Sequence, residues 1–249
     1  MKINVFGDFN ALVSAGVEKF IALANQSIVE RGQFSVALSG GSTPDPFYRG
    51  LAEPANQKRI IWEKVHLFWG DERPVPPDHA DSNFNMVQAA LINHVPIPEV
   101  NVHRVPAEMD VRLAAFSYEE TLRDFFKGDW PRFDLVLLGM GEDGHTASLF
   151  PGSAGLNEAH RWFIANYAPR QETWRLTLTK HAINAAQNVW VLVKGGSKAD
   201  KLAEVLTGPR DPWANPIQLI DPEDGEMVWM VDEAAASALP EGFEKEPHP

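Results

Sequence analysis

The residues best suited to chemistry lie in one stretch, in which Asp143 precedes His145 by two positions. A histidine can act as a general base. The stretch follows the apolar run 135–138, which is long enough for a buried strand and too short for a helix. Ligands of open α/β sheets bind just beyond the carboxyl ends of the strands. We therefore predict that His145 transfers a proton; the alternative is a histidine that only hydrogen-bonds within its own loop.

A second glycine-rich stretch, residues 39–44, follows the apolar run 34–38. Its backbone N–H groups and hydroxyls, at the expected start of a helix, would form an anion site. The residues that would provide this site are Gly40, Gly41, Ser42 and Thr43. The stretch contains neither a Walker A sequence nor GxGxxG, so it does not indicate a nucleotide site. An ordinary strand-to-helix turn is the alternative.

An Asp-Glu-Arg cluster follows the apolar run 65–69. Its arginine, Arg73, could hold a phosphate or a carboxylate through two parallel hydrogen bonds. We place Asp71 and Arg73 among the substrate-binding residues. The alternative is an arginine paired internally with Asp71 or Glu72.

The sequence 194–198 is a second Gly-Gly junction between an apolar run and a helical pattern, and it carries two lysines. Ammonium groups near a helix N-terminus oppose the helix dipole unless an anion is present. We therefore predict a bound phosphate near Lys198. Solvated surface lysines are the alternative.

Apolar runs and helical patterns alternate along the chain. Strands are expected at 3–6, 34–38, 65–69, 133–138, 162–165, 175–178, 186–193, 217–220 and 227–230, with a short one around 101–103. The clearest helices are expected over 83–93 and 111–126, together with one helix that ends near 31 and one that ends near 206. This alternation predicts an α/β fold, a Rossmann-like three-layer sandwich around a mostly parallel sheet. We expect a single catalytic domain over residues 1–237 and a flexible tail over 238–249.

Composition narrows the classes of function. The net charge of −12 argues against general binding of nucleic acid or of anionic membranes. The chain has no cysteine, which excludes disulfides, thiol nucleophiles and thiolate metal sites. No apolar run approaches the roughly 20 residues of a membrane span, and no signal peptide is evident. We expect a cytoplasmic protein and favour a monomer, although the sequence does not define the oligomeric state.

Taken in order, the motifs resemble those of the 6-phosphogluconolactonase family, within the glucosamine-6-phosphate isomerase/deaminase superfamily. The resemblance covers roughly residues 8–235. The motifs that carry it are SGGSTP at 39–44, WGDER at 69–73 with SNF at 82–84, LGMGEDGHTASLFPG at 138–152, RLTLT at 175–179 and VKGGSK at 193–198.

The resemblance implies hydrolysis of 6-phospho-D-glucono-1,5-lactone, a small phosphosugar, without a metal or another cofactor. It implies that His145 is the base that activates water, and that Asp143 orients the ring or shapes the loop. Arg73 and Lys198 would hold the substrate, with its phosphate near the SGGST loop, and Arg175 would contact that phosphate. Glycine-loop N–H groups at 141–144 could stabilise the developing oxyanion.

Two positions depart from the family pattern. Gly70 stands where the family often has alanine or another small residue, which should be harmless. Lys194 stands where threonine is common, and it adds a cation whose role the resemblance leaves open.

Three rival functions follow from the same residues. A sugar-phosphate deaminase or isomerase of this superfamily typically has a glutamate where this chain has Phe150. A non-catalytic sugar-phosphate sensor would usually carry a DNA-binding segment, and neither a spare helix-turn-helix region nor the basic charge for one is present. A metal enzyme could draw on nearby acids and histidines, but no HExxH or comparable spacing joins them.

Overall fold

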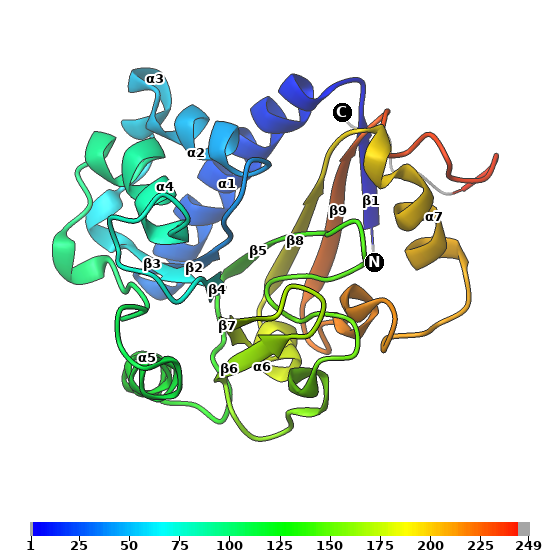
Figure 1. Ribbon diagram of the computed structural model, residues 1–249. Helices are drawn as coiled ribbons and strands as arrows, with labels where there is room; N and C mark the ends of the chain where they lie inside the picture. Colours follow the sequence, from blue (N-terminus) through cyan, green and yellow to red (C-terminus); the bar gives the residue numbers. More distant parts are fainter. Residues whose placement is uncertain (1, 244–249) are drawn as a thin grey trace.

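The computed structural model describes residues 2–243, and its centre is a six-stranded sheet (Figure 1). The strand order is β1-β9-β8-β5-β2-β3, and every neighbouring pair is parallel. The strands are β1 (Lys2–Phe6), β2 (Phe34–Leu38), β3 (Val65–Trp69), β5 (Leu135–Gly139), β8 (Asn188–Val193) and β9 (Glu226–Asp232). All five residues of β2 are buried, as in a parallel sheet covered on both faces.

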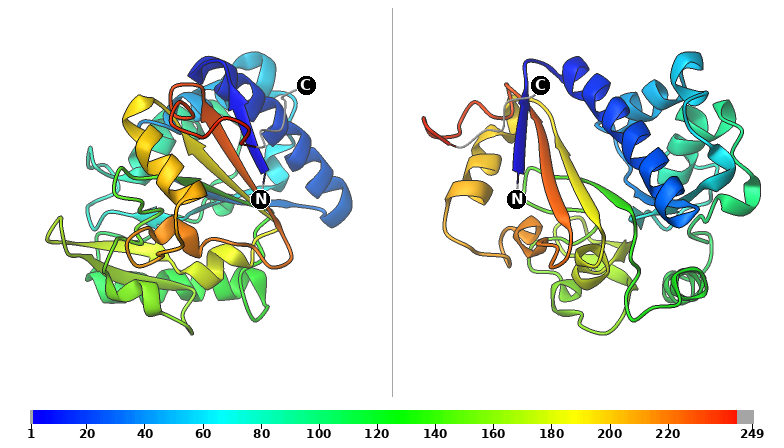
Figure 2. Two further views of the ribbon diagram at one scale, coloured as in Figure 1. Left: turned by 90° about the vertical axis from the view of Figure 1, so that its right-hand side faces the viewer. Right: turned by 180° about the vertical axis from the view of Figure 1, so that it is seen from behind.

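Helices cover both faces of this sheet. Figure 1 shows α1 and α7 on opposite sides of β8 and β9, and the rear view in Figure 2 agrees. The helices are α1 (Phe9–Arg31), α2 (Asp45–Ala52), α3 (Pro54–Gln57), α4 (Asn83–Ala90), α5 (Val111–Phe126), α6 (Lys180–Asn184) and α7 (Ala199–Thr207). Asp8 caps α1 by accepting the N–H of Ala11, and Gly32 ends it with φ +80°. The predicted α/β sandwich with a mostly parallel sheet in one domain is confirmed.

A second, antiparallel sheet of three strands has the order β4-β7-β6. It consists of β4 (Asp71–Glu72), β6 (Phe163–Ala168) and β7 (Thr173–Leu178). The acidic pair Asp71-Glu72, which lies outside the strands expected from the sequence, is therefore a short strand, and Asp71 lies opposite Thr177. This pairing fixes the backbone of the Asp-Glu-Arg cluster.

Two expected strands are absent from the described residues. Pro216–Leu219 forms a 3₁₀ helix, η6, where a strand over 217–220 was expected. Its proline has no N–H to give to a sheet. Around 101–103 only a single bridge forms, between Leu67 and Val102.

The predicted tail over 238–249 lies partly outside the described residues. Within the described part, Leu239 and Phe243 are partly buried and pack against the core. None of the helices in residues 2–243 has both the length and the apolar character needed to cross a membrane.

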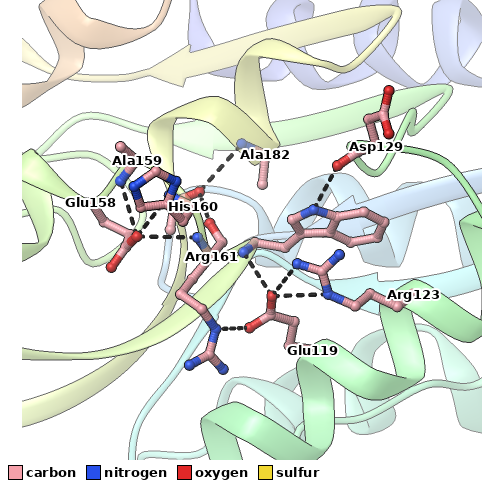
Figure 3. Close-up of polar contacts among 10 residues, drawn as sticks. Glu119, Arg123, Asp129, Glu158, Ala159, His160, Arg161 and Ala182 are labelled. Atoms are coloured by element: carbon pink, nitrogen blue, oxygen red, sulfur yellow. Dashed lines mark hydrogen bonds and ion pairs between the residues drawn. The ribbon is translucent and has the colours of Figure 1, made fainter.

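A buried carboxylate links α5 to the segment that leads into β6 (Figure 3). Glu119 is 3% exposed and accepts hydrogen bonds from Arg123, one turn along α5, and from Arg161. It also accepts the N–H of Trp162 at 3.2 Å, and the Arg123 guanidinium lies 4.4 Å from the centre of the Trp162 ring. Because its charge is paired on both sides, Glu119 can remain buried and hold the small sheet against α5.

A half-buried histidine pair makes folding stability depend on pH. His66 Nδ1 lies 3.2 Å from His103 Nε2, and the His103 ring stacks on Phe68. The pKa of His103 is lowered to about 4, mainly by burial and to a smaller extent by the neighbouring His66. The unfolded chain binds this proton more readily, with a pKa of about 6.5. The neutral ring therefore stabilises the fold above pH of about 6.5, and this contribution is lost as pH falls through about 4.

We expect His103→Phe to flatten the acid side of the stability profile. The free energy of unfolding, measured with urea between pH 7 and pH 4, should fall less steeply in this variant than in the unmodified protein. Identical pH slopes in the two proteins would contradict a role for His103 in acid sensitivity.

Candidate active site

The predicted motifs meet because they follow four neighbouring strands, β8, β5, β2 and β3. The loops beyond the carboxyl ends of these strands line a cavity of about 480 Å³. The structure brings together eight residues predicted from the sequence: Gly40, Gly41, Ser42, Thr43, Asp71, Arg73, His145 and Lys198. Open α/β sheets bind their ligands at this place, beyond the carboxyl ends of the strands.

The histidine of the site is oriented by the acid that precedes it. His145 Nδ1 lies 2.5 Å from Asp143 Oδ1, and the His145 backbone N–H donates to the same oxygen at 3.2 Å. With Nδ1 donating to the carboxylate, Nε2 is left as the basic nitrogen of the neutral ring. The imidazole is 31% exposed and lines the cavity, whereas Asp143 does not line it.

Asp143 stays ionised over the ordinary pH range. Burial alone would raise the pKa of this carboxyl, but the hydrogen bond and charge of His145 outweigh burial and lower the pKa to about 2. A carboxylate that keeps its charge can stabilise the imidazolium that forms when His145 accepts a proton.

The glycine loop serves to shape the site more than to supply free donors. The N–H of Gly141 donates to the His145 carbonyl at 2.8 Å, and the N–H of Gly144 donates to the Gly141 carbonyl at 3.1 Å. Of the N–H groups over 141–144 that were expected to stabilise an oxyanion, those of Gly141 and Gly144 are therefore already paired. Gly141 is needed for space instead, because a Cβ there would lie 2.0 Å from His145 Nδ1.

The SGGST loop presents unpaired donors to the cavity. Among the described residues, no hydrogen bond is made by the backbone N–H groups of Gly40, Gly41, Ser42 or Thr43. The loop is fixed at its start by Tyr48, whose hydroxyl accepts the N–H of Ser39 and donates to the Ser39 carbonyl. Gly41 has φ +97°, a conformation that glycine adopts without strain. The start of α2 follows, so the local field favours an anion.

Asp71 is held on the wall of the cavity by two partners. Ser148 Oγ donates to Asp71 Oδ2 at 2.7 Å, and Asn83 Nδ2 donates to the Asp71 carbonyl at 2.8 Å. Asn83 also packs under the SGGST loop, where a Cβ on Gly40 would lie 1.7 Å from its Oδ1. Asn83 therefore joins the Asp-Glu-Arg cluster to the first Gly-Gly turn.

Arg73 and Glu72 have separate roles. The Arg73 guanidinium donates to the Asp81 carbonyl at 2.6 Å and makes no ion pair with Asp71 or Glu72, so the internally paired alternative is not what the structure shows. Glu72 is 2% exposed and accepts the N–H groups of Asn83 and Phe84 at the start of α4. Burial raises the pKa of Glu72 despite these hydrogen bonds. Its role is to anchor α4, which leaves Arg73 facing the cavity.

Arg175 is a predicted residue that does not line the main cavity. It lines an adjacent cavity of about 390 Å³, which shares only Arg73 with the main pocket. Its guanidinium donates to Thr173 Oγ1 and to the Trp174 carbonyl. Burial, and then the charge of Arg73, lowers the pKa of Arg175.

Five polar residues of the pocket were not among the predicted site residues: Ser39, Asn83, Glu142, Lys194 and Ser197. Lys198 Nζ lies 3.7 Å from Glu142 Oε1, an ion pair across the mouth of the pocket. The sequence contained a signal for Asn83, because this residue belongs to the SNF motif at 82–84, one of the motifs that carry the family resemblance. Within residues 2–243, no group of three or more His, Cys, Asp or Glu side chains is arranged to hold a metal ion.

The fold and the pocket define an α/β protein in which an oriented histidine, three cationic side chains and unpaired backbone N–H groups line one cavity at the carboxyl edge of the sheet. Residues 7–229 match the family model of glucosamine-6-phosphate isomerases/6-phosphogluconolactonase, and the chain belongs to this family.

Named relatives cover nearly the whole chain. It is 44% identical over 218 residues to a 6-phosphogluconolactonase from Synechocystis sp., covering 86% of this chain and 88% of the relative. It is 39% identical to a 6-phosphogluconolactonase from Nostoc sp., covering 95% and 98% of the two chains. The crystal structure of a Thermotoga maritima 6-phosphogluconolactonase matches with a TM-score of 0.80 at 32% identity, covering 93% and 99%.

Proposed function

We propose that this protein hydrolyses 6-phospho-D-glucono-1,5-lactone to 6-phosphogluconate, with His145 as the general base. The names of the relatives support the reaction. The observation that carries the mechanism is the 2.5 Å hydrogen bond between His145 and Asp143, at one wall of a cavity that also contains cations and unpaired N–H groups.

In this mechanism His145 Nε2 takes a proton from water as the water oxygen attacks the lactone carbonyl carbon. The bond between that carbon and the ring oxygen then breaks, and the ring oxygen takes the proton back from the imidazolium. Asp143 stabilises the imidazolium between these two transfers. Ser148 is not needed as a nucleophile, because it is 1% exposed and its hydroxyl is committed to Asp71.

The phosphate lies at the SGGST loop, and Arg73 and Lys198 balance its charge. A carboxylate would repel a phosphate, so Asp71 instead accepts a hydrogen bond from a sugar hydroxyl. Binding the phosphate far from the carbonyl orients the lactone for attack. Contact of Arg175 with the phosphate stays a prediction, as do the monomeric state and the cytoplasmic location.

Arg73→Ala and Lys198→Ala should mainly raise KM, because each removes binding shared by the ground state and the transition state. A charged hydrogen bond of about 1.5–3 kcal/mol corresponds to a rise of about 10- to 100-fold. Steady-state kinetics on the phosphorylated lactone would measure it. A large fall in kcat with unchanged KM would place these residues in the chemical step instead.

The rival within the family is a deaminase or isomerase of amino-sugar phosphates. The structure places the Phe150 ring 4.6 Å from the His145 ring, so an apolar group occupies space where ring-opening chemistry would use a carboxylate. A sensor that binds phosphosugars without turnover is the rival of another class.

A coupled assay on freshly prepared lactone, corrected for spontaneous hydrolysis, separates these functions. We expect lactone hydrolysis far above background and no comparable release of ammonia from glucosamine 6-phosphate. Ammonia release at a similar rate would favour the deaminase. Tight binding of 6-phosphogluconate with no turnover would favour the sensor.

A further inference from the structure

Lys194 occupies a fixed position at the end of β8. The N–H of Gly195 donates to both carboxylate oxygens of Asp232, at 2.9 and 3.0 Å, and Gly195 has φ +86°. Asp232 is the last residue of β9, the strand next to β8. The backbone from which the Lys194 side chain extends is therefore held by the edge of the sheet.

The Lys194 ammonium group is held between the two Gly-Gly turns. Its Nζ donates to the Ser42 carbonyl at 3.3 Å and lies 4.4 Å from the centre of the Phe9 ring. Phe9 is the first residue of α1 and packs against the core, so it provides a firm aromatic surface. These contacts place the cation on the wall of the cavity, beside the SGGST loop.

The Lys194 ammonium group differs from that of Lys198 in its acidic partners. In residues 2–243 Lys194 makes no ion pair, whereas Lys198 Nζ lies 3.7 Å from Glu142 Oε1. An ammonium group has three donors, and a single hydrogen bond is found for Lys194. The neighbouring N–H groups of the SGGST loop are likewise unpaired. Several donors without acceptors around one cavity indicate a ligand with several anionic oxygens.

We propose that Lys194 is a substrate-binding residue that recognises the phosphate and makes the protein select phosphorylated lactones over unphosphorylated ones. This inference rests on the proposed function and assigns a specificity role within it. Glu142 partly neutralises the charge of Lys198, and Lys194 supplies a positive charge that is not neutralised in this way. The contact of Lys194 with Ser42 keeps that charge beside the loop whose N–H groups face the phosphate.

Two variants test the proposal. Lys194→Met removes the charge at similar side-chain length, and Lys194→Arg keeps it. We expect Lys194→Met to raise KM for 6-phosphogluconolactone about 10- to 100-fold, as for loss of a charged hydrogen bond, with little change in kcat. Its kcat/KM for unphosphorylated D-glucono-1,5-lactone should not change, and Lys194→Arg should retain most of the phosphate preference.

Lys19→Met is the matched control. Lys19 also lies over an aromatic ring, with Nζ 5.6 Å from the centre of the Trp190 ring, but it does not line the pocket. This variant loses the same charge from the whole protein and should keep the kinetics of the unmodified protein with both lactones.

Calorimetric titration with 6-phosphogluconate tests the role of Lys194 in phosphate binding separately from the proposed hydrolysis of the lactone. Weaker binding by Lys194→Met than by the unmodified protein supports phosphate recognition even if no lactone is hydrolysed, in which case only the proposed function fails. The role of Lys194 is overturned if KM and product affinity stay within twofold of the unmodified values. Equal losses with the phosphorylated and unphosphorylated lactones would also overturn it.

Discussion

Replacing His145 with alanine is expected to lower kcat for lactone hydrolysis by about 10²- to 10⁴-fold, the usual contribution of a positioned general base. The affinity for 6-phosphogluconate should stay nearly unchanged, because the phosphate donors lie on other loops. Steady-state kinetics and calorimetry on the same preparation measure the two quantities.

The role of His145 is decided by comparing the change in kcat with the change in the affinity for 6-phosphogluconate. A fall in product affinity that matches the fall in kcat would mean that His145 holds the substrate and does not act as the base. Near-normal turnover would require another base in the pocket. Asp143 is a poor substitute, because it does not line the cavity and its pKa of about 2 makes it a weak proton acceptor.

Gly141→Ala is expected to be nearly as harmful, although it removes no functional group. The added methyl would lie 2.0 Å from His145 Nδ1 and 2.7 Å from Asp143 Oδ1, between the two atoms that orient the base. The ring must move, and a displacement of about 1 Å at a reacting group can cost about 10²-fold in rate. We expect kcat to fall by about this factor while the protein stays folded.

Gly70→Ala provides the control for this substitution. Gly70 also follows a strand of the six-stranded sheet, the edge strand β3, but a Cβ there would meet only the Leu38 carbonyl, at an ordinary 3.5 Å. The Gly70 variant should keep its activity, and thermal unfolding of both variants would report their stability. Full activity in Gly141→Ala would show that the His145–Asp143 pair tolerates displacement, and the orienting role of Asp143 would then be in doubt.

The central sheet was predictable because its signals are local. The apolar runs at β2, β3 and β5 are buried on both faces, so their residues alone identify them as strands. Asp8 and Ser82 cap helices through neighbours three residues away, which a sequence pattern also reveals. The meeting of four motifs then follows from the parallel arrangement of the strands.

Other features depended on contacts between distant residues. Two residues of β4 carry no strand signal, and they form a strand only because Leu176 and Thr177 lie opposite them. The position of Lys194 over Phe9 depends on the packing of α1 beside β8 and β9. Arg175 lies in one of the motifs that carry the family resemblance, yet its side chain lines the adjacent cavity.

Imidazole rescue of the His145→Ala variant tests the central claim most directly. Added imidazole should restore hydrolysis of the phosphorylated lactone above the rate of imidazole-catalysed hydrolysis without protein, and the restored rate should saturate as the vacated space fills. No rise above that background, in a variant that still binds 6-phosphogluconate, would contradict the assignment of His145 as the base.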